Sequence, residues 1–237
     1  MITRLKRIKT VNRRWLAIWL LIYSGFILID LFFPQLALLS AALKYVGIFL
    51  CAIYAHVAHK RDTQLVIAMF LTLLADTVLM LVGAQIIGVY IFCFAQMFHT
   101  LRLSKAPNVA LRGYFVMLFF VFACGTLWGF PALYVMSFTY AATLITNLIL
   151  AWRWYKAEPT NIYAVSSLLG FILFICCDIN VALAYISQTG GIPAFIAPIC
   201  NFLVFVFYYP SQVLISNSST ITKPKIAIGR TGISTMR

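Results

Sequence analysis

The sequence predicts an all-α, polytopic transmembrane helix bundle of about eight spans, with both termini in the cytoplasm. Of its 237 residues, 63% are apolar and only 10% are charged, whereas a soluble domain has about 25% charged residues. The chain divides into apolar runs of about 20 residues, the length that one helix needs to cross a bilayer. Its basic residues fall on alternate connections between these runs. Lipid is therefore the solvent of most of the chain.

The apolar runs predict the spans in order. They are expected at about 15–33, 36–57, 64–82, 114–129, 132–152, 163–186 and 194–215, with a fourth span that follows the short turn bracketed by Gly83 and Gly88 and ends at about 103. Pro34, the pair Phe130-Pro131 and the turn SQTGGIP end three of these runs, as glycine and proline commonly do. The chain then divides into a basic N-terminus at 1–14, one transmembrane domain at 15–215, and a basic, disordered tail at 216–237.

The basic residues give the direction of each span. Six lie in the N-terminus and four in the tail, and the connections after spans two, four and six hold the rest apart from Lys44: Lys60, Arg61, Arg102, Lys105, Arg112, Arg153 and Lys156. The intervening turns carry none. Because lysine and arginine are retained on the cytoplasmic side, this alternation predicts a multi-pass protein of the plasma membrane with both termini inside.

The charge and cysteine patterns exclude several other classes. A net charge of +13 could indicate nucleic-acid binding, but its distribution follows topology and gives no phosphate-binding surface. The basic N-terminus is expected to attract anionic lipid headgroups, at about 1 kcal/mol per basic residue; a specific lipid or partner site is the alternative. The six cysteines lie inside apolar runs without metal spacing, and His56 and His59 lack a third ligand. No metal or cofactor is expected, and no nucleotide-binding or hydrolase fingerprint is present.

Four charged residues lie within the spans: Asp30, Lys44, Asp76 and Asp178. A charge at the bilayer centre costs about 2.5–3.5 kcal/mol, so such residues face the bundle interior, form pairs or take part in chemistry. Counting along the helices places all four in the outer half of the bundle. We expect Lys44 to pair with Asp76 or Asp178, or to be a structural ion-pair partner, and Asp30 to be a hydrated residue at a helix end.

Two further polar sets lie nearer the cytoplasmic side. Gln96, His99 and Arg102 are spaced by three and share one face of span four, while Tyr208 and Gln212 share a face of span eight. Arg102 is expected to extend toward the inner interface. The others are either interhelical hydrogen-bonding residues or supports of a site that binds a ligand.

The order of these polar residues resembles the YhhN family, which includes lysoplasmalogenases. The segment LTLLADTVLML is similar to the stretch around the family's first aspartate, which Asp76 matches, and LLGFILFICCDINVALAYI to the second, which Asp178 matches. FYYPSQVLIS is similar to the end of the last span, with Tyr208 and Gln212. The resemblance covers roughly residues 44–216.

Three positions depart from the family pattern. Tyr45 follows Lys44 where the family usually has proline, and Ala75 precedes Asp76 where it usually has glycine. In span four, Gln96 stands in place of the family's histidine and His99 in place of its tyrosine.

The resemblance implies hydrolysis of the vinyl ether bond of lysoplasmalogens to a fatty aldehyde and a glycerophospho-base. Membrane lipid, as a lysophospholipid, would be the substrate. One of Asp76 and Asp178 would stay protonated and act as the acid, while the other would stay ionised. Lys44, Gln96, His99, Tyr208 and Gln212 would bind substrate or support them. The alternative is a non-enzymatic relative, either a transporter or a binding or structural membrane protein, which the altered span-four motif favours.

Overall fold

The computed structural model describes residues 13–221 and confirms the predicted fold class. These residues form eight helices long and apolar enough to span a membrane, and no strand. The helices are α1 (Arg13–Phe32), α2 (Ala37–His59), α3 (Thr63–Thr77), α4 (Gln85–Leu103), α5 (Pro107–Leu127), α6 (Ala132–Ala157), α7 (Ile162–Gln188) and α8 (Ile196–Ser216). A short 3₁₀ turn (Pro34–Leu36) precedes α2, and a π-helical segment (Val78–Val82) extends α3.

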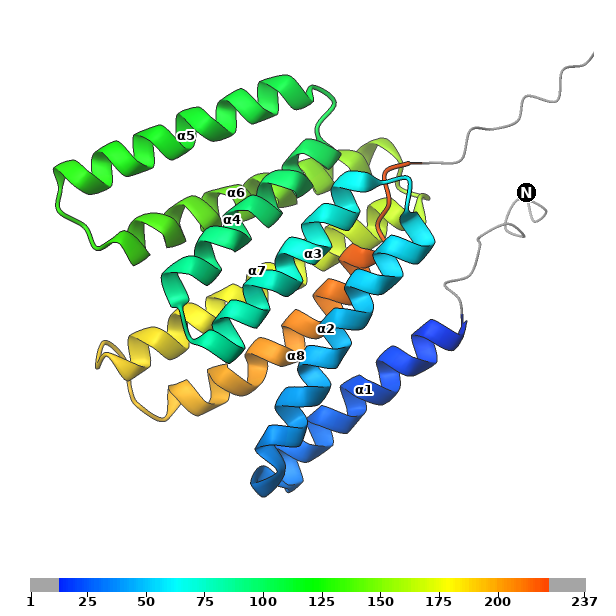
Figure 1. Cartoon of the computed structure of the whole chain (residues 1–237), viewed down its shortest axis with the longest axis vertical. Coiled ribbons are helices and arrows are strands. Elements are labelled where there is room, and N and C mark those ends of the chain that lie inside the picture. The colour runs from blue at the N-terminus through cyan, green and yellow to red at the C-terminus, as the bar shows by residue number, and fades with distance from the viewer. Residues whose placement is uncertain (1–12, 222–237) are drawn as a thin grey trace, which may run out of the picture.

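Six helices form a closed ring in the order α2, α3, α4, α6, α7 and α8, with α8 returning to pack on α2. The two remaining helices lie outside this ring, α1 against α2 and α8, and α5 against α4 and α6 (Figure 1). The helices α1 to α4 therefore pack against their neighbours in the same pattern as the helices α5 to α8. The chain has a parallel four-plus-four arrangement, in which α3 and α7 are equivalent.

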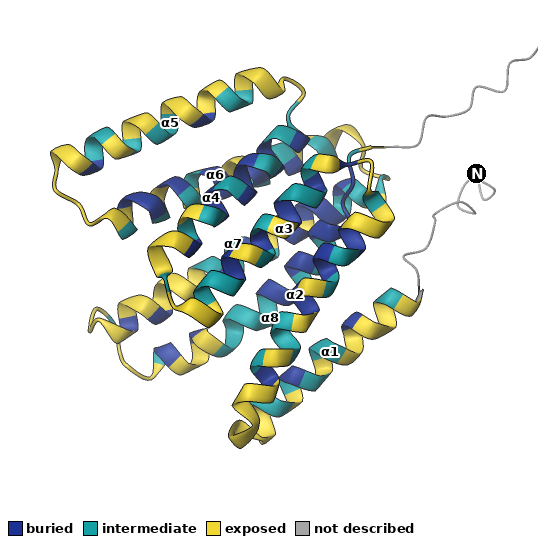
Figure 2. Cartoon of the chain, in the orientation of Figure 1, coloured by how far each residue is buried: buried dark blue, intermediate teal, exposed yellow. Residues whose placement is uncertain are grey.

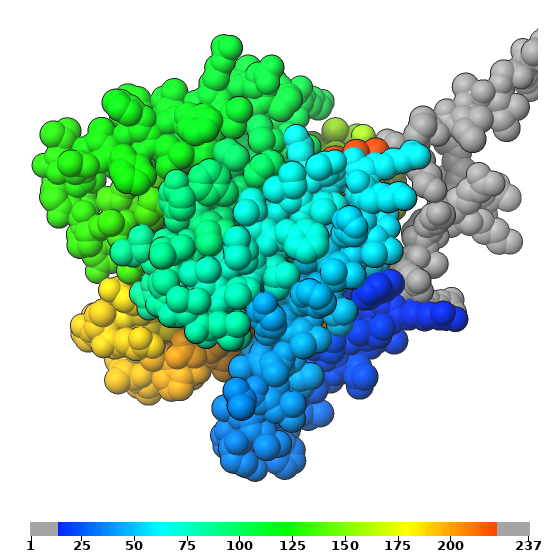
Figure 3. Space-filling model, viewed as in Figure 1, coloured from blue at the N-terminus to red at the C-terminus, as the bar shows by residue number. Residues whose placement is uncertain are grey.

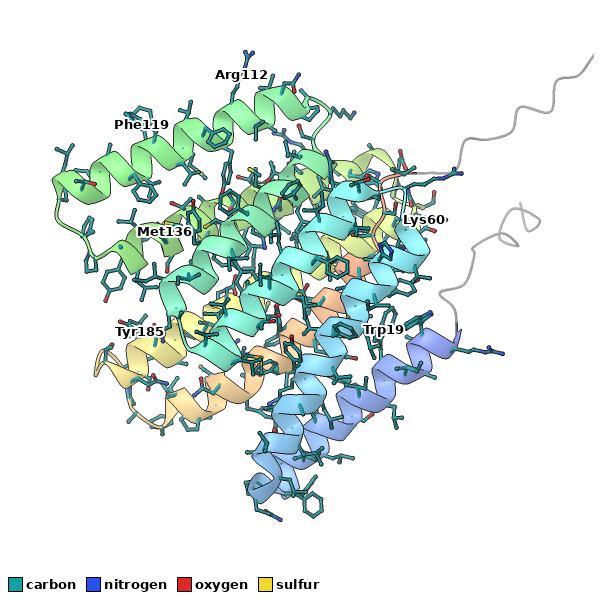
Figure 4. All side chains as sticks on the ribbon, viewed as in Figure 1. Trp19, Lys60, Arg112, Phe119, Met136 and Tyr185 are labelled. Atoms are coloured by element: carbon teal, nitrogen blue, oxygen red, sulfur yellow. The ribbon has the colours of Figure 1, made fainter. Side chains whose placement is uncertain are left out.

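The outward faces of α1 and α5 are largely exposed, and the buried residues gather inside the ring (Figure 2). In a membrane those exposed apolar faces meet lipid. Trp19 of α1 points into the bundle and not toward lipid. Its side chain is only 2% exposed and packs edge-on against Tyr54 of α2, with a ring-centroid distance of 4.8 Å (Figure 4).

Local chemistry explains where several helices begin. Asp62 caps α3 by accepting a hydrogen bond from the backbone N–H of Leu65, and Asn161 caps α7 in the same way through Tyr163. The helix α5 begins at Pro107 and not near 114. Backbone N–H groups in the first turn of a helix have no carbonyl partner within the helix, so a proline, which has no N–H, is well tolerated there. Arg112 is consequently a helix residue, and α6 likewise extends beyond 152, to Ala157.

Pro210 lies inside α8 without interrupting it. Proline cannot donate to the carbonyl four residues earlier, which here belongs to Val206. The hydroxyl of Tyr23 on α1 donates to that carbonyl oxygen at 3.1 Å. The ring of Tyr23 also stacks on Tyr209 at a centroid distance of 5.7 Å. The backbone acceptor freed by proline thus helps to fix α1 on the outside of the ring.

The chain has a basic end, formed by the α2–α3, α4–α5 and α6–α7 connections and residues 217–221, and a non-basic end formed by the other connections. Residues 217–221 are not the free start of a tail. Asp62 accepts hydrogen bonds from the Thr220 backbone N–H at 2.8 Å and from the Ser219 hydroxyl at 3.1 Å. Arg102 donates to the Ser218 carbonyl at 2.6 Å.

The guanidinium of Arg102 extends to the basic end, as expected, but it is only 6% exposed. Residues 217–221 fold over the basic end and give its guanidinium a carbonyl partner there. The expected basic segments at 1–12 and 222–237 lie outside the described residues.

Candidate functional site

Two carboxyl groups inside the bundle are each hydrogen-bonded to a tyrosine on another helix. The hydroxyl of Tyr208 on α8 donates to Asp76 of α3 at 2.6 Å. The hydroxyl of Tyr140 on α6 donates to Asp178 of α7 at 2.7 Å. Asp76 is 7% exposed and Tyr208 6%. Such short O–H···O contacts are typical of bonds in which one partner is charged.

The two pairs lie beside each other inside the ring. The ring of Phe174, which is 1% exposed, lies 5.5 Å from that of Tyr208 and 6.5 Å from that of Tyr140. The Cys177 thiol is close enough to interact electrostatically with both Asp178 and Asp76. One cluster inside the ring therefore holds both carboxyls, Asp76 buried and Asp178 partly buried, and the Phe174 ring contacts both tyrosines.

The helix that carries Asp76 changes its geometry directly after it. Thr77 ends the α-helical part of α3, and the π-helical segment Val78–Val82 follows. The Thr77 and Tyr45 hydroxyls share a hydrogen bond of 2.9 Å between α3 and α2. Such π-helical turns are frequent at functional sites, because they re-aim the side chains around them.

Lys44 does not pair with either carboxyl of this cluster. Its Nζ lies 2.7 Å from Asp30 Oδ2, and the Ser40 hydroxyl donates to the other oxygen of Asp30. The exposed fractions of the two charged side chains are only 14% and 18%. Asp30 is thus an ion-pair partner and not a hydrated end residue, because the short turn at 33–36 brings the ends of α1 and α2 together.

Gln96 and His99 lie deeper in the ring, near its basic half. The Asn147 side chain of α6 donates to Gln96 Oε1 at 2.8 Å, and Thr100 donates to Asn147 at 2.8 Å. His99 is 1% exposed, with its ring 5.5 Å from Phe171. Within residues 13–221 no hydrogen bond joins Gln96, His99 or Gln212 to either carboxyl, so the structure does not assemble every candidate around one point.

The ring interior contains polar atoms that no protein group satisfies within the described chain. They come from four helices of the ring: Thr72 Oγ1, Gln96 Nε2, His99 Nδ1, Ser167 Oγ and Gln212 Oε1. Buried polar groups in folded proteins are nearly always hydrogen-bonded, and ordered water commonly supplies the partner. The interior on the basic side of the carboxyls is therefore chemically suited to water.

A recess of about 500 Å³ opens at the non-basic end, and neither carboxyl nor its tyrosine is part of its lining. Its lining is Lys44, Gln85, Val181, Ala184, Tyr185, Gln188, Asn201, Val204 and Phe205. Val181 lies one helical turn from Asp178, and Phe205 one turn from Tyr208. Figure 3 shows this side of the molecule, with the orange surface of α8 beside the teal surface of the α3–α4 connection.

A second cavity, of about 380 Å³, lies among α4, α5 and α6 and has an apolar, mainly aromatic lining without any of the carboxyls. No group of three or more histidine, cysteine, aspartate or glutamate side chains in the described part of the chain is placed to hold a metal ion.

Tyr140 and Phe174 were not singled out from the sequence, and Asp30 was expected only as a hydrated residue at a helix end. The four-plus-four arrangement supplies a signal for Tyr140, because Tyr45 and Tyr140 occupy the same position counted from the first residues of α2 and α6. Each of them bonds to a side chain at or next to the aspartate position of the following helix.

Comparison with known proteins gives one match. A search of curated proteins and of solved structures found no match to the chain. A family model described as the YhhN family matches residues 36–219, which is most of the chain and includes both carboxyl–tyrosine pairs, Lys44 and the recess. On this match and on its eight-helix membrane fold, the chain belongs to the YhhN family.

Proposed function

We propose that this protein is a membrane-embedded hydrolase that opens the vinyl ether bond of lysoplasmalogens, with Asp76 and Asp178 as its acid–base pair. The observation that carries the proposal is that two carboxyls inside the ring are each held by a tyrosine hydroxyl, with a recess at the non-basic end whose wall residues lie one helical turn away. The resemblance of both aspartate segments to those of lysoplasmalogenases supports the substrate class.

The chemistry suits two carboxyl groups in different protonation states. The protonated carboxyl gives its proton to the outer carbon of the C=C–O unit, which leaves an oxocarbenium-like cation on the carbon bonded to oxygen. The ionised carboxylate stabilises that cation and takes a proton from the attacking water. The resulting hemiacetal loses its hydroxyl proton and breaks its bond to the glycerol oxygen, which is protonated. The products are a fatty aldehyde and a glycerophospho-base.

The surroundings of the two carboxyls fit these roles. The proposed hydrolysis needs one carboxyl in its protonated form and the other in its ionised form. The tyrosine hydroxyls fix the orientation of each carboxyl and donate to its ionised form. The unsatisfied polar atoms on the basic side of the cluster provide partners for the water that hydrolysis consumes.

The test is aldehyde release by purified protein in lipid nanodiscs. The substrates are three lysophosphatidylethanolamines whose chains are joined by a vinyl ether, a saturated ether or an ester. Only the vinyl ether lipid should yield aldehyde. Asp76→Asn and Asp178→Asn should each lower the rate by about 10²–10⁴-fold, because asparagine cannot transfer a proton or carry a negative charge.

Glu158→Gln is the matched control, since it makes the same acid-to-amide change in an exposed residue of the α6–α7 connection and should keep full activity. Circular dichroism would verify that every variant retains its helices. Full activity in either aspartate variant would contradict the assignment of that residue.

The second candidate function is a non-enzymatic membrane protein. It is favoured by span four, where Gln96 and His99 are engaged with Asn147 and Phe171 and not with the carboxyls. A wild-type protein that binds lysolipids but releases no aldehyde from any of the three lipids would support this function over hydrolysis.

A further inference from the structure

The Lys44–Asp30 ion pair lies within the membrane-spanning part of the chain, away from the two carboxyls of the candidate site. Its atoms are 2.7 Å apart, and both side chains are mostly covered. Removing two charges from water is expensive, and a buried ion pair often stabilises a protein no better than apolar residues of the same size. Stability alone is therefore a weak reason for a membrane protein to contain this pair.

The lysine of this pair also lines the recess. Its Nζ lies 4.5 Å from the centroid of the Phe205 ring and 5.6 Å from that of Phe26. Three amide side chains line the same space: Gln85 at the start of α4, Gln188 at the end of α7, and Asn201 on α8. A lysine ammonium and several amide N–H groups together are a donor set suited to the oxygens of a phosphate.

Two residues in the wall of the recess connect it to the two carboxyl–tyrosine pairs along their own helices. Val181 and Phe205 in its wall each lie one helical turn, about 4.5–5.4 Å along the axis, from Asp178 and Tyr208. A glycerol backbone joins the phosphate of a lysoplasmalogen to its vinyl ether oxygen. A phosphate beside Lys44 therefore leaves the scissile bond within reach of the carboxyls.

We propose that Lys44 and Asp30 form the headgroup site of the lipid, Lys44 binding the phosphate and Asp30 the ammonium group of a zwitterionic phosphoethanolamine-type headgroup. This inference rests on the proposed function. On binding, each charge of the ion pair exchanges its protein partner for the opposite charge of the headgroup, so that no charge is left unpaired. The pair in the ligand-free protein holds both side chains in place for this exchange.

The experiment measures binding and not turnover. Saturated-ether lysophosphatidylethanolamine has the headgroup but no vinyl ether bond, so it serves as a non-hydrolysable probe. Monoalkylglycerol, which lacks the phosphate, and saturated-ether lysophosphatidic acid, which lacks the amine, are the comparison ligands. Affinities would be measured by native mass spectrometry of the full chain in detergent micelles.

The double variant Lys44→Met/Asp30→Asn removes both charges without leaving one buried alone. It should bind the ethanolamine probe at least tenfold more weakly than the wild type and monoalkylglycerol equally well. Asp30→Asn alone should weaken binding of the ethanolamine probe but not of lysophosphatidic acid. Lys60→Met, an equivalent change in the exposed α2–α3 turn, is the control and should alter no affinity (Figure 4).

Unchanged affinity of the double variant for the ethanolamine probe would overturn the inference. So would an equal loss for monoalkylglycerol, because that would indicate a purely structural role for the pair. The binding assay and the turnover assay test different proposals. If the wild type released no aldehyde, the proposed hydrolysis would be wrong, but a charge-dependent loss of probe binding would still establish the headgroup site.

Discussion

The bond between Tyr208 and Asp76 offers a quantitative test of how the candidate site is built. The change Tyr208→Phe removes one hydroxyl and leaves the ring in place between Phe174 and Phe205. Because both partners are less than a tenth exposed, water has little access to replace the lost donor. The effect on stability therefore reports the hydrogen bond itself.

Its magnitude depends on the charge of Asp76. A hydrogen bond to a charged group contributes about 1.5–3 kcal/mol to stability, and one between neutral groups about 0.5–1.5 kcal/mol. The length of 2.6 Å is typical of a charge-assisted O–H···O bond. We expect Tyr208→Phe to lower the free energy of unfolding by about 1.5–3 kcal/mol if Asp76 is the ionised carboxyl, and by about 0.5–1.5 kcal/mol if it is the protonated one.

A double-mutant cycle separates this bond from other effects of the change. Wild type, Tyr208→Phe, Asp76→Leu and the double variant would be unfolded with sodium dodecyl sulfate in mixed micelles and followed by circular dichroism. The expected coupling free energy is about 1.5–3 kcal/mol for an ionised Asp76 and about 0.5–1.5 kcal/mol for a protonated one. Tyr90→Phe, which removes a hydroxyl from a tyrosine that is 47% exposed, is the control and should be near neutral. A coupling below about 1.5 kcal/mol would contradict an ionised Asp76, and one below about 0.5 kcal/mol would contradict the hydrogen bond itself.

Three other predictions follow from the packing and from the ends of the bundle. Gly47→Leu should destabilise the protein by about 1–3 kcal/mol in the same unfolding assay, because a Cβ at this position would lie 2.1 Å from the Tyr209 ring; stability equal to that of the wild type would contradict the close α2–α8 contact. Ending the chain after Ser216 should lower thermal stability, since Asp62 and Arg102 lose their partners in residues 218–220, whereas ending it after Ile221 keeps those bonds; equal melting temperatures for the two truncations would contradict a structural role of this segment. Reporter domains fused after Arg61, Lys105 and Lys156 should all face the cytoplasm, and one reporter on the opposite side would invalidate the topology at that span.

The sequence determined the features that depend on local composition. Eight spans, their order and the basic end follow from the length of the apolar runs and the position of lysine and arginine, because insertion into a bilayer acts on each segment largely by itself. The costly residues Asp76 and Asp178 could be singled out for the same reason. The family followed from the order of short motifs around those two aspartates.

Only the tertiary structure decided which side chains meet. Hydropathy does not fix the rotation of a helix about its axis; close contacts do, such as Gly47 against Tyr209 and Gly170 against Ile215. Those contacts bring Asp178 to Tyr140 and leave Lys44 with Asp30. Residues 217–221 similarly bury Arg102, although their polar composition predicted a free tail. Partner choice depends on packing between segments far apart in the chain, and no local pattern of residues encodes it.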